Sequence, residues 1–327
     1  MQRIPAIVLL ADRVSNHSAA SLSSADLEFA DDEYFGDLLS GLQQIAPSVT
    51  HHDDIVGFID RIEQHRDHLV ISTWSGERSR NRRALVPSVC EAYGVAYVGA
   101  DAYTSAVCQD KHLSKRLCAD FGLATPAGVL IRGDADMDLL DAIRYPAVVK
   151  PNHQGGSIGI GADCLVASTG AAAGTVRRLL TAFGPPVIVE EFIRGREVSV
   201  VFAGSRKGVA VAEAVEITLS GSGPALADTI WSFEMKKQYS RSAAYASAAH
   251  LIDAVDMERC TRLFHALQKC EYLRIDGRVR DSGFTIIELS PDAYLGSDGA
   301  VAAAFQQRGA GYAEMLITLV RCAYENR

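Results

Sequence analysis

The chain has 327 residues, of which 48% are hydrophobic, and its formal net charge is −8. This length allows a large buried core divided over two or three domains, and the acidic balance argues against a nucleic-acid partner, which normally requires a basic patch. The apolar stretches are short and interrupted by charges, and residues 1–20 lack the basic start and apolar centre of a signal peptide, so we expect a cytoplasmic protein without a membrane partner.

The first hundred residues alternate between predicted strands and predicted helices. The strands cover residues 6–11, 69–74 and 95–100, and the helices cover 31–47, 54–67 and 82–94. His51 and His52 fall between two of these helices, in what we expect to be a polar loop. Strands that alternate with helices predict a parallel sheet covered on both faces, so residues 1–105 are expected to form a Rossmann-like α/β domain.

After this domain the pattern changes to strands joined by short loops. One or two helices are expected over 104–122, and others near 171–184, near 250–270 and at the C-terminus. The strands cover 126–131, 145–151, 158–168, 186–192, 197–204 and 208–219. Short connections predict partly antiparallel sheets, an α+β arrangement that we divide into a central subdomain, 106–186, and a C-terminal subdomain, 187–327. The Gly-, Ser- and Pro-containing segment 219–230 is expected to be mobile or to act as a lid.

The seven cysteines form neither a Cys-x-x-Cys pair nor a zinc-binding spacing. We expect reduced, buried thiols that pack as small apolar side chains. The nine histidines show no metal-binding pattern either, so neither residue type is assigned any chemistry.

A glycine-rich loop, KPNHQGGSIGIG over residues 150–161, follows a predicted strand. Its glycines let the backbone approach a ligand closely, and successive amide groups can surround a phosphate. The loop is neither a Walker A motif nor a dinucleotide fingerprint, and a plain glycine hairpin is the alternative. Lys111, Lys150 and Lys236 would flank a bound phosphate if the domains fold together, although each alone is more typical of a solvated surface charge.

The stretch VIVEEFIRGREVSVVF, residues 187–202, contains three acidic residues, Glu190, Glu191 and Glu197. Its strand and connector could offer backbone groups to a nucleotide base and a carboxylate to the ribose hydroxyls. The alternative for Glu197 is an edge-strand charge that discourages aggregation.

The stretch RIDGRVRDSGFTIIELSPD, residues 274–292, predicts a β-hairpin. If the turn centres on Ser282, Asp276 lies opposite Glu288 and Arg274 lies opposite Ser290, all on one face. The opposite face is expected in the core and carries Ile275, Val279, Ile287 and Leu289.

The two opposed carboxylates of this hairpin are the strongest chemical signal in the chain. At ~5 Å they repel by about 3 kcal/mol at an effective dielectric near 20. A magnesium ion would remove this repulsion, because Mg²⁺ prefers hard oxygen ligands shared with phosphates and water. Arg274, on the same face, could then stabilise an oxyanion or a phosphoryl group. The alternative is a solvent-facing hairpin with a strained pair.

Five stretches, in this order along the chain, resemble the ATP-grasp superfamily and most closely its D-alanine:D-alanine ligase branch. They are QDKHLSKRLCADFGLATP, YPAVVKPNHQGGSIGI, VIVEEFIRGREVSV, FEMKKQ and RIDG with IIELSPDAYLGSDGA. The resemblance runs from about Asp110 to the C-terminus, roughly two thirds of the chain. It implies an ATP-grasp fold that follows the Rossmann-like domain, the cofactors ATP and two Mg²⁺ ions, which Mn²⁺ could replace, and a ligase that joins a small-molecule carboxylate to an amine through an acylphosphate. It also admits a homodimer.

The resemblance further implies roles for individual residues. The nucleotide would contact Lys111, Lys150, Gly155, Gly156, Ser157, Glu190, Glu191, Ile193, Glu197 and Lys236. The catalytic residues would be Arg274, Ser157 and Lys236, and the metal ligands Asp276, Glu288, Ser290 and Asp292.

Three departures from the branch bear on its substrate. Ser290 stands where the family has an asparagine, so one Mg²⁺ is expected to be held weakly or through water unless Asp292 compensates. The segment LLADRVSNHSAASLSS lacks the glutamate that holds the ammonium group of the first alanine. The stretch TWSGERSRNRR is basic where those enzymes are acidic and glycine-rich.

Its four arginines, Arg78, Arg80, Arg82 and Arg83, could hold a second carboxylate or a phosphate, although a solvated helix start is the more common use of such a run. We therefore expect a specialised biosynthetic ligase that does not act on D-alanine pairs. The alternatives are a D-alanine:D-alanine ligase with unusual loops, a nucleotide-binding protein without ligase activity, and a kinase.

Overall fold

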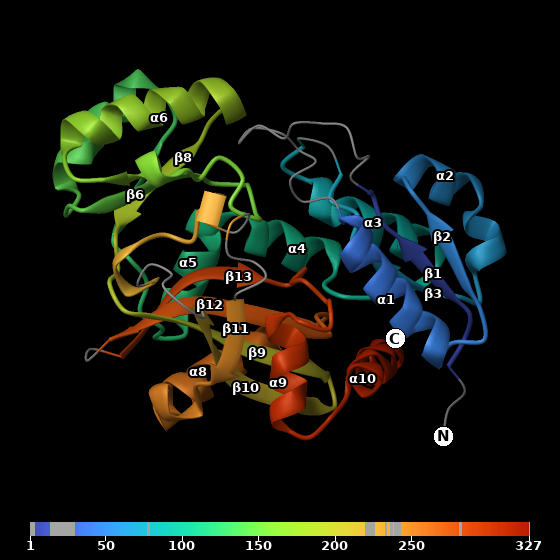
Figure 1. Ribbon diagram of the computed structural model, residues 1–327. Helices are drawn as coiled ribbons and strands as arrows, with labels where there is room; N and C mark the ends of the chain where they lie inside the picture. The colour runs from blue at the N-terminus through green and yellow to red at the C-terminus, as the bar shows by residue number, and fades with distance from the viewer. Residues whose placement is uncertain are drawn as a thin grey trace.

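The structure, a computed structural model, describes residues 4–13, 30–76, 79–219, 226–232, 234–235, 238, 243–280 and 283–326. Within these residues the strands form three separate sheets (Figure 1). The predicted fold class, with a parallel N-terminal sheet followed by antiparallel sheets, is confirmed.

The N-terminal sheet is parallel and has the order β2-β1-β3-β4. Its strands are β1 (Ile7–Leu10), β2 (Val49–His52), β3 (Leu69–Ser72) and β4 (Ala96–Val98), and the helices of this region are α1 (Asp32–Ile45), α2 (Ile55–Asp60), the 3-10 helix η2 (Ile62–His65) and α3 (Arg82–Tyr93). The polar loop expected at His51 and His52 is wrong, because both residues belong to β2. Four residues of the composition Val-Thr-His-His carry no strand periodicity, and their pairing with β1 determines the strand.

The central sheet is antiparallel and has the order β5-β8-β6-β7. Its strands are β5 (Gly128–Ile131), β6 (Ala147–Pro151), β7 (Leu165–Val166) and β8 (Val187–Glu191), accompanied by α6 (Thr169–Phe183) and the 3-10 helices η3 (Asp134–Ala142) and η4 (Ala162–Cys164). The strand predicted over 158–168 is wrong for most of its length. Ser157 and Gly159 have φ angles of 65° and 75°, so the chain turns here and becomes extended only at β7.

The C-terminal sheet has the antiparallel order β11-β10-β9-β12-β13. Its strands are β9 (Arg196–Ser205), β10 (Gly208–Leu219), β11 (Ala243–Ser247), β12 (Tyr272–Arg280) and β13 (Gly283–Ser290). The remaining helices are α4 (Ala102–Gln109), α5 (Lys111–Asp120), α8 (Ala254–Ala266), α9 (Ala300–Gln307), α10 (Tyr312–Glu325) and the 3-10 helices η5 (Leu226–Asp228) and η7 (Ala249–Leu251). Residues 220–225 of the expected lid lie outside the described residues.

The hairpin β12–β13 pairs Asp276 with Glu288, as predicted. A β-bulge follows, so that Gly277 pairs with Ile286 and Ile287 is the extra residue. The bulge also corrects the predicted core face: Ile286 is fully buried, whereas Ile287 is half-buried. A residue inserted in one strand reverses the alternation beyond it, which a strictly alternating prediction cannot include.

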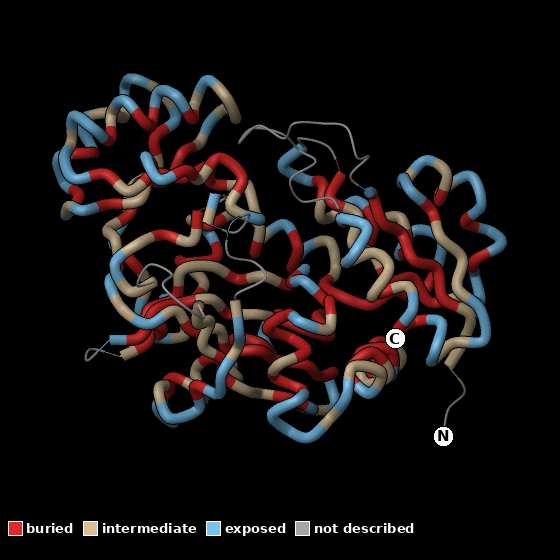
Figure 2. The backbone as a smooth tube through the Cα atoms, viewed as in Figure 1, coloured by how far each residue is buried: buried red, intermediate tan, exposed pale blue. Residues whose placement is uncertain are grey.

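Two hydrophobic cores join the N-terminal and C-terminal parts of the chain (Figure 2). One core packs Leu38 and Leu42 of α1 with Leu316 and Leu319 of α10, together with residues of β1, β3 and β9. The other brings α4 and α5 onto β9, β12 and β13. The central sheet, α6 and η3 form a third core, which also includes Ile230 from the C-terminal subdomain. Because β8 completes the central sheet, we propose that the boundary between the two subdomains follows β8, after Glu191, instead of preceding it.

All seven cysteines are buried and unpaired, and burial raises the pKa of the Cys90 thiol to about 12. Among the described residues, no helix has both the length and the apolar character needed to cross a membrane.

Candidate active site

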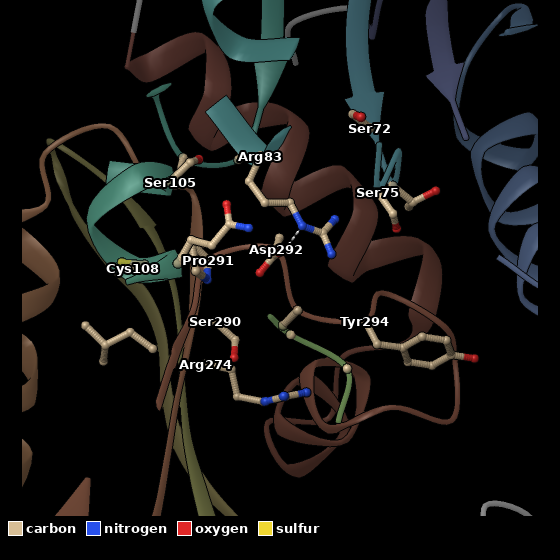
Figure 3. Close-up of a pocket in the computed structure, with 18 of the residues that line it drawn as sticks. Ser72, Ser75, Arg83, Ser105, Cys108, Arg274, Ser290, Pro291, Asp292 and Tyr294 are labelled. Atoms are coloured by element: carbon tan, nitrogen blue, oxygen red, sulfur yellow. Dashed lines mark ion pairs between the residues drawn. The ribbon is translucent and has the colours of Figure 1, made fainter. Parts of the chain in front are cut away.

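A cavity of about 370 Å³ lies where the three parts of the chain meet (Figure 3). The N-terminal domain contributes the end of β3 with the loop that follows and the start of α3. The central subdomain contributes the glycine loop, and the C-terminal subdomain contributes the end of β13 and residues 290–294. The predicted site residues that line this space are Lys111, Gly155, Gly156, Ser157, Arg274, Glu288, Ser290 and Asp292. Lys150, Glu190, Glu191, Ile193, Glu197 and Asp276 are not among its lining residues.

Each hairpin carboxylate has its own cationic partner. Asp276 accepts hydrogen bonds from Arg274 Nε at 2.7 Å and Arg274 Nη2 at 2.9 Å, and from the hydroxyls of Ser199 at 2.6 Å and Ser290 at 3.2 Å. Glu288 accepts a hydrogen bond from Lys111 Nζ at 2.5 Å. Neither carboxylate therefore faces the other as a bare charge.

These partners keep Arg274 and Glu288 ionised. Burial alone would lower the pKa of Arg274, but the charge of Asp276 outweighs it and raises this pKa above its ordinary value. Burial alone would raise the pKa of Glu288, but Lys111, with help from Lys150 and Arg274, lowers it to about 2. The hairpin is a charged site at neutral pH.

Asp292 points toward the N-terminal domain. Its Oδ2 lies 2.8 Å from Nε of Arg83, the second residue of α3, and Figure 3 shows the pair across the cavity. Arg83 Nη1 also donates to the backbone oxygen of Trp74 at 3.5 Å. The ion pair connects α3 to the loop that follows the hairpin.

The donor set of the hairpin fits a magnesium ion. Two opposed carboxylates and one hydroxyl are hard oxygen donors, and Mg²⁺ typically takes one or two carboxylates together with phosphates and water. Arg274 and Lys111 are paired with the carboxylates that would hold such an ion. Within the described part of the chain, no group of three or more His, Cys, Asp or Glu side chains could hold a metal by itself.

The glycine loop turns its backbone into the cavity. Gly155, Gly156 and Ser157 line the cavity, and Gly156 and Ser157 have φ angles of 60° and 65°. The Ser157 hydroxyl donates to the backbone oxygen of Trp231 at 2.8 Å. Lys111 Nζ donates to the backbone oxygen of Gln154, so the same lysine contacts the glycine loop and the hairpin β12–β13.

Behind the glycine loop, one buried glutamate is paired with two buried lysines. Glu190 at the end of β8 contacts Lys150 of β6 and Lys115 of α5. Burial raises the pKa of Glu190 less than the two lysines lower it, so the carboxylate stays ionised. Burial lowers the pKa of Lys115 to about 8 despite the charge of Glu190.

Three further predicted residues lie beside this group. The backbone oxygen of Ile193 accepts a hydrogen bond from Arg278 Nη1 at 3.2 Å, and Glu197 pairs with Arg278 Nη2 at 3.0 Å. Glu191 is half-buried at the end of β8. Lys236 lies outside the described residues, as does Arg78.

Sequence reasoning missed Lys115 and Arg278. Lys115 lies four residues after Lys111, on the same face of α5, and Arg278 lies two residues after Asp276 on β12. Helical and strand periodicity could have indicated both positions.

Sequence reasoning also missed Asp12, which lies two residues beyond β1 and is buried. Its Oδ2 accepts hydrogen bonds from the backbone amides of Ser75 at 2.9 Å and Gly76 at 3.0 Å. Its Oδ1 is buried without a hydrogen-bond partner in the described structure, and burial raises the pKa of this carboxyl to about 6. Asp12 thus fixes the loop after β3 that forms one wall of the cavity.

Residues 119–321 match the family model described as the D-ala D-ala ligase C-terminus. The chain belongs to the D-Ala–D-Ala ligase family. It is therefore an ATP-dependent carboxylate–amine ligase of the ATP-grasp fold, as predicted.

Individual relatives share about a quarter of their aligned residues with this chain. The chain is 27% identical over 258 residues to the uncharacterised protein y4sG of Sinorhizobium fredii, which is 78% of this chain and 74% of that protein. It is 27% identical over 239 residues to a D-alanine–D-alanine ligase of Bordetella petrii, which is 70% of this chain and 68% of that ligase.

Solved structures share the fold over nearly the whole chain. The D-alanine–D-alanine ligase of Bacillus anthracis in complex with ATP superposes with a TM-score of 0.74 at 16% identity, covering 98% of this chain and 97% of that ligase. The VanG D-Ala:D-Ser ligase of Enterococcus faecalis gives a TM-score of 0.68 at 18% identity, covering 98% of this chain and 99% of that ligase.

Proposed function

We propose that this ligase joins a small-molecule carboxylate to an amine through an acylphosphate, in specialised small-molecule biosynthesis, and that its substrates are not a pair of D-alanines. The observation that carries the proposal is that Glu288, Arg274 and Lys111 line one cavity together with the glycine loop, with Asp276 paired to Arg274.

For the nucleotide, we assign the phosphates to Lys111, Lys150 and the amides of Gly155, Gly156 and Ser157. Glu190, Glu191, Ile193 and Glu197 are assigned to the adenosine, and Lys236 to the γ-phosphate. The burial of Lys150 and Glu190 supports this assignment, because two buried lysines around one carboxylate leave a positive charge that a phosphate would balance.

For the metal, Asp276 and Glu288 would hold two Mg²⁺ ions, with the Ser290 hydroxyl as a weaker third donor. Asp292 would have to leave Arg83 before it could take part. Bound Mg²⁺ would neutralise the charge on the transferring phosphoryl group, and Mn²⁺ could replace it.

In the reaction, the chain's own residues would position the phosphoryl group and the acid, and would stabilise the charge that develops. Amides of the glycine loop and Lys111 hold the phosphoryl group in line with the attacking carboxylate. A carboxylate oxygen of the acid attacks the γ-phosphorus, the bond from this phosphorus to ADP breaks, and ADP leaves. The amine then attacks the acyl carbon, and phosphate leaves as the amide bond forms. Arg274, kept charged by Asp276, donates to the oxyanion of the tetrahedral intermediate.

Purified protein incubated with ATP, Mg²⁺ and pooled acids, with hydroxylamine as a general nucleophile, tests this proposal. ADP together with a hydroxamate supports an acylphosphate and identifies the acid by mass. ADP with a stable phosphorylated product would instead indicate a kinase, and D-alanyl-D-alanine formed from D-alanine alone would indicate the cell-wall ligase. No ADP with any pool would contradict the proposal. Light scattering tests the predicted homodimer in the same preparation.

A further inference from the structure

Two arginines from the N-terminal domain, Arg82 and Arg83, lie in the wall of the cavity. Arg82 and Arg83 are the first two residues of α3, which begins where the loop after β3 ends. Arg82 is 3% exposed and the Arg83 side chain is 17% exposed. The solvated helix start considered from the sequence is therefore not what the structure has at these two positions, whereas Arg80 is exposed.

Both guanidinium groups extend across the cavity toward other parts of the chain. Arg82 Nη1 donates to the Gln154 side-chain oxygen in the glycine loop at 3.1 Å. Arg83 Nε contacts Asp292 at 2.8 Å. In Figure 3, Arg83 lies above Asp292 and Arg274 lies below Ser290, so the two arginines lie on opposite sides of these residues. A substrate whose reacting carboxylate lies near Arg274 would meet Arg83 with its other end.

The charges of the cavity wall are unequal. Its described residues include four cationic side chains, Arg82, Arg83, Lys111 and Arg274, but only two carboxylates, Glu288 and Asp292. Lys111 and Arg274 adjoin the proposed phosphate and metal positions, whereas Arg82 and Arg83 are the cationic side chains that α3 contributes to the wall. Asp292, at 41% exposure, is the more exposed partner of Arg83, so a substrate carboxylate could displace it.

The start of α3 also favours an anionic ligand at this wall of the cavity. Asn81, which precedes the helix, makes no capping hydrogen bond with its side chain, and the positive end of the helix lies at the same wall. Trp74 and Tyr97 from the neighbouring segments provide aromatic surface for the body of a ligand. An ammonium group at this end would meet two guanidinium groups, whereas an oxyanion would be bound by both.

We infer that the acid substrate carries a second anionic group, a carboxylate or a phosphate, which Arg82 and Arg83 bind. The inference rests on the proposed function, since it assigns the far end of the acid that the enzyme activates. Arg82 and Arg83 are specificity residues here, and the chemical class of the substrate is a diacid or a phosphorylated acid.

The test compares acids in pairs that differ only in the charge of the second group, using ADP release in the presence of hydroxylamine. The pairs are succinate and succinamate, glutarate and glutaramate, aspartate and asparagine, glutamate and glutamine, and phosphoserine and serine. We expect kcat/KM for the better anionic acids to exceed that of their neutral partners at least tenfold. A larger value for phosphoserine than for the dicarboxylates identifies the group as a phosphate, and the reverse identifies a carboxylate.

Four variants separate recognition from structure. In Arg83→Gln and Arg82→Gln the preference for the anionic acid should fall at least tenfold, mainly through KM. In Arg83→Gln the dissociation constant of ATP should stay the same. Arg80→Gln, an exposed arginine in the same run, is the matched control and should keep the preference. Asp292→Asn removes the ion pair but keeps Arg83, so it should also keep the preference.

The outcomes that overturn the inference are distinct from those that overturn the proposed function. If neutral acids or simple amino acids react best, or if Arg83→Gln and Arg82→Gln keep the charge preference, this inference is wrong and the ligase proposal stands. If Asp292→Asn loses the preference as Arg83→Gln does, the ion pair and not substrate contact explains the effect. If no acid in the panel or in the pools gives ADP, the proposed function fails and the inference fails with it.

Discussion

Asp276 and Glu288 are directly opposed on β12 and β13, yet each is neutralised by a different partner, Arg274 from the same strand and Lys111 from α5. The arrangement removes a repulsion of about 3 kcal/mol that two bare carboxylates at ~5 Å would have. A metal bound between the carboxylates would free Lys111 and Arg274 for phosphate and substrate oxygens. In the proposed site, metal binding would therefore be coupled to the release of two cations from their carboxylate partners.

Glu288→Gln should lower kcat by about 100-fold or more, because an amide cannot supply the charge that a divalent cation needs. It should also destabilise the fold by about 3 kcal/mol, because buried Lys111 loses its partner. ADP release and urea unfolding measure the two effects. Glu258→Gln, at an exposed position of α8, is the control and should change neither. Full activity in Glu288→Gln would show that the metal site is wrongly assigned.

Ser290→Asn should lower the Mg²⁺ concentration for half-maximal activity at least threefold. The amide carbonyl is a better metal ligand than the Ser290 hydroxyl, which now donates to Asp276. A titration of ADP release against Mg²⁺ at fixed ATP measures the effect, and Ser290→Ala should move the midpoint the opposite way. A midpoint unchanged in both variants would exclude residue 290 from the metal site.

Lys115→Met should raise the KM for ATP about tenfold and destabilise the protein by about 3 kcal/mol, because it removes one of the two buried cations that hold Glu190. Calorimetric titration with an ATP analogue separates weaker nucleotide binding from a slower reaction. The matched control is Arg116→Gln, an exposed neighbour on the same helix. An unchanged affinity would limit Lys115 to a role in stability.

Asp12→Asn should change how stability depends on pH. The pKa of Asp12 is raised from 3.8 to about 6 in the folded protein, so its contribution to stability is present below about pH 4 and is lost as the pH rises through 6. The loss amounts to about 3 kcal/mol, since one pKa unit corresponds to 1.36 kcal/mol. The free energy of unfolding of Asp12→Asn, measured relative to that of the wild type, should therefore increase as the pH is raised from 4.5 to 7.5. Parallel unfolding curves of both proteins measure this, and a constant difference across the range would contradict it.

Gly277→Ala should destabilise the hairpin by about 3 kcal/mol and lower activity with it. A Cβ at position 277 would lie 2.5 Å from the backbone oxygen of Thr285 and would also collide with the Phe284 ring. Gly277 lies at the bulge that keeps Asp276 opposite Glu288, so relief of the collision would disturb that alignment. Thermal unfolding and ADP release report the two effects. Gly133→Ala, where a Cβ meets no atom within 4 Å, should be nearly neutral.

Local sequence pattern was sufficient for much of the fold and for part of the site. Alternation of strands and helices predicted the parallel sheet, and the alternation within residues 274–292 predicted the pairing of Asp276 with Glu288. The hairpin pairing was correct although the assumed turn differed. Arg280 pairs with Gly283, which by itself would shift the register by one residue, and the bulge at Ile287 restores it.

Other features depend on contacts that sequence periodicity does not contain. Lys115 meets Glu190 across 75 sequence positions, and Arg278 meets Glu197 across 81. The burial of Arg82 follows from the approach of the glycine loop to α3, whereas the sequence shows only a basic run. Strand β2 exists because β1 offers it an edge, so its own residues give no signal.

The helix α10 at the end of the chain has a further consequence for how the enzyme admits its substrates. It packs against α1 while sharing a core with β9, so these early and late parts of the chain form one continuously packed base (Figure 1). The central sheet has a separate core and is joined to this base near residues 124–127 and 192–195. Access to the nucleotide should therefore be controlled by a hinge movement of the central sheet alone. A chain that ends before α10 would lose the base against which this hinge moves, even with every proposed nucleotide and metal residue in place.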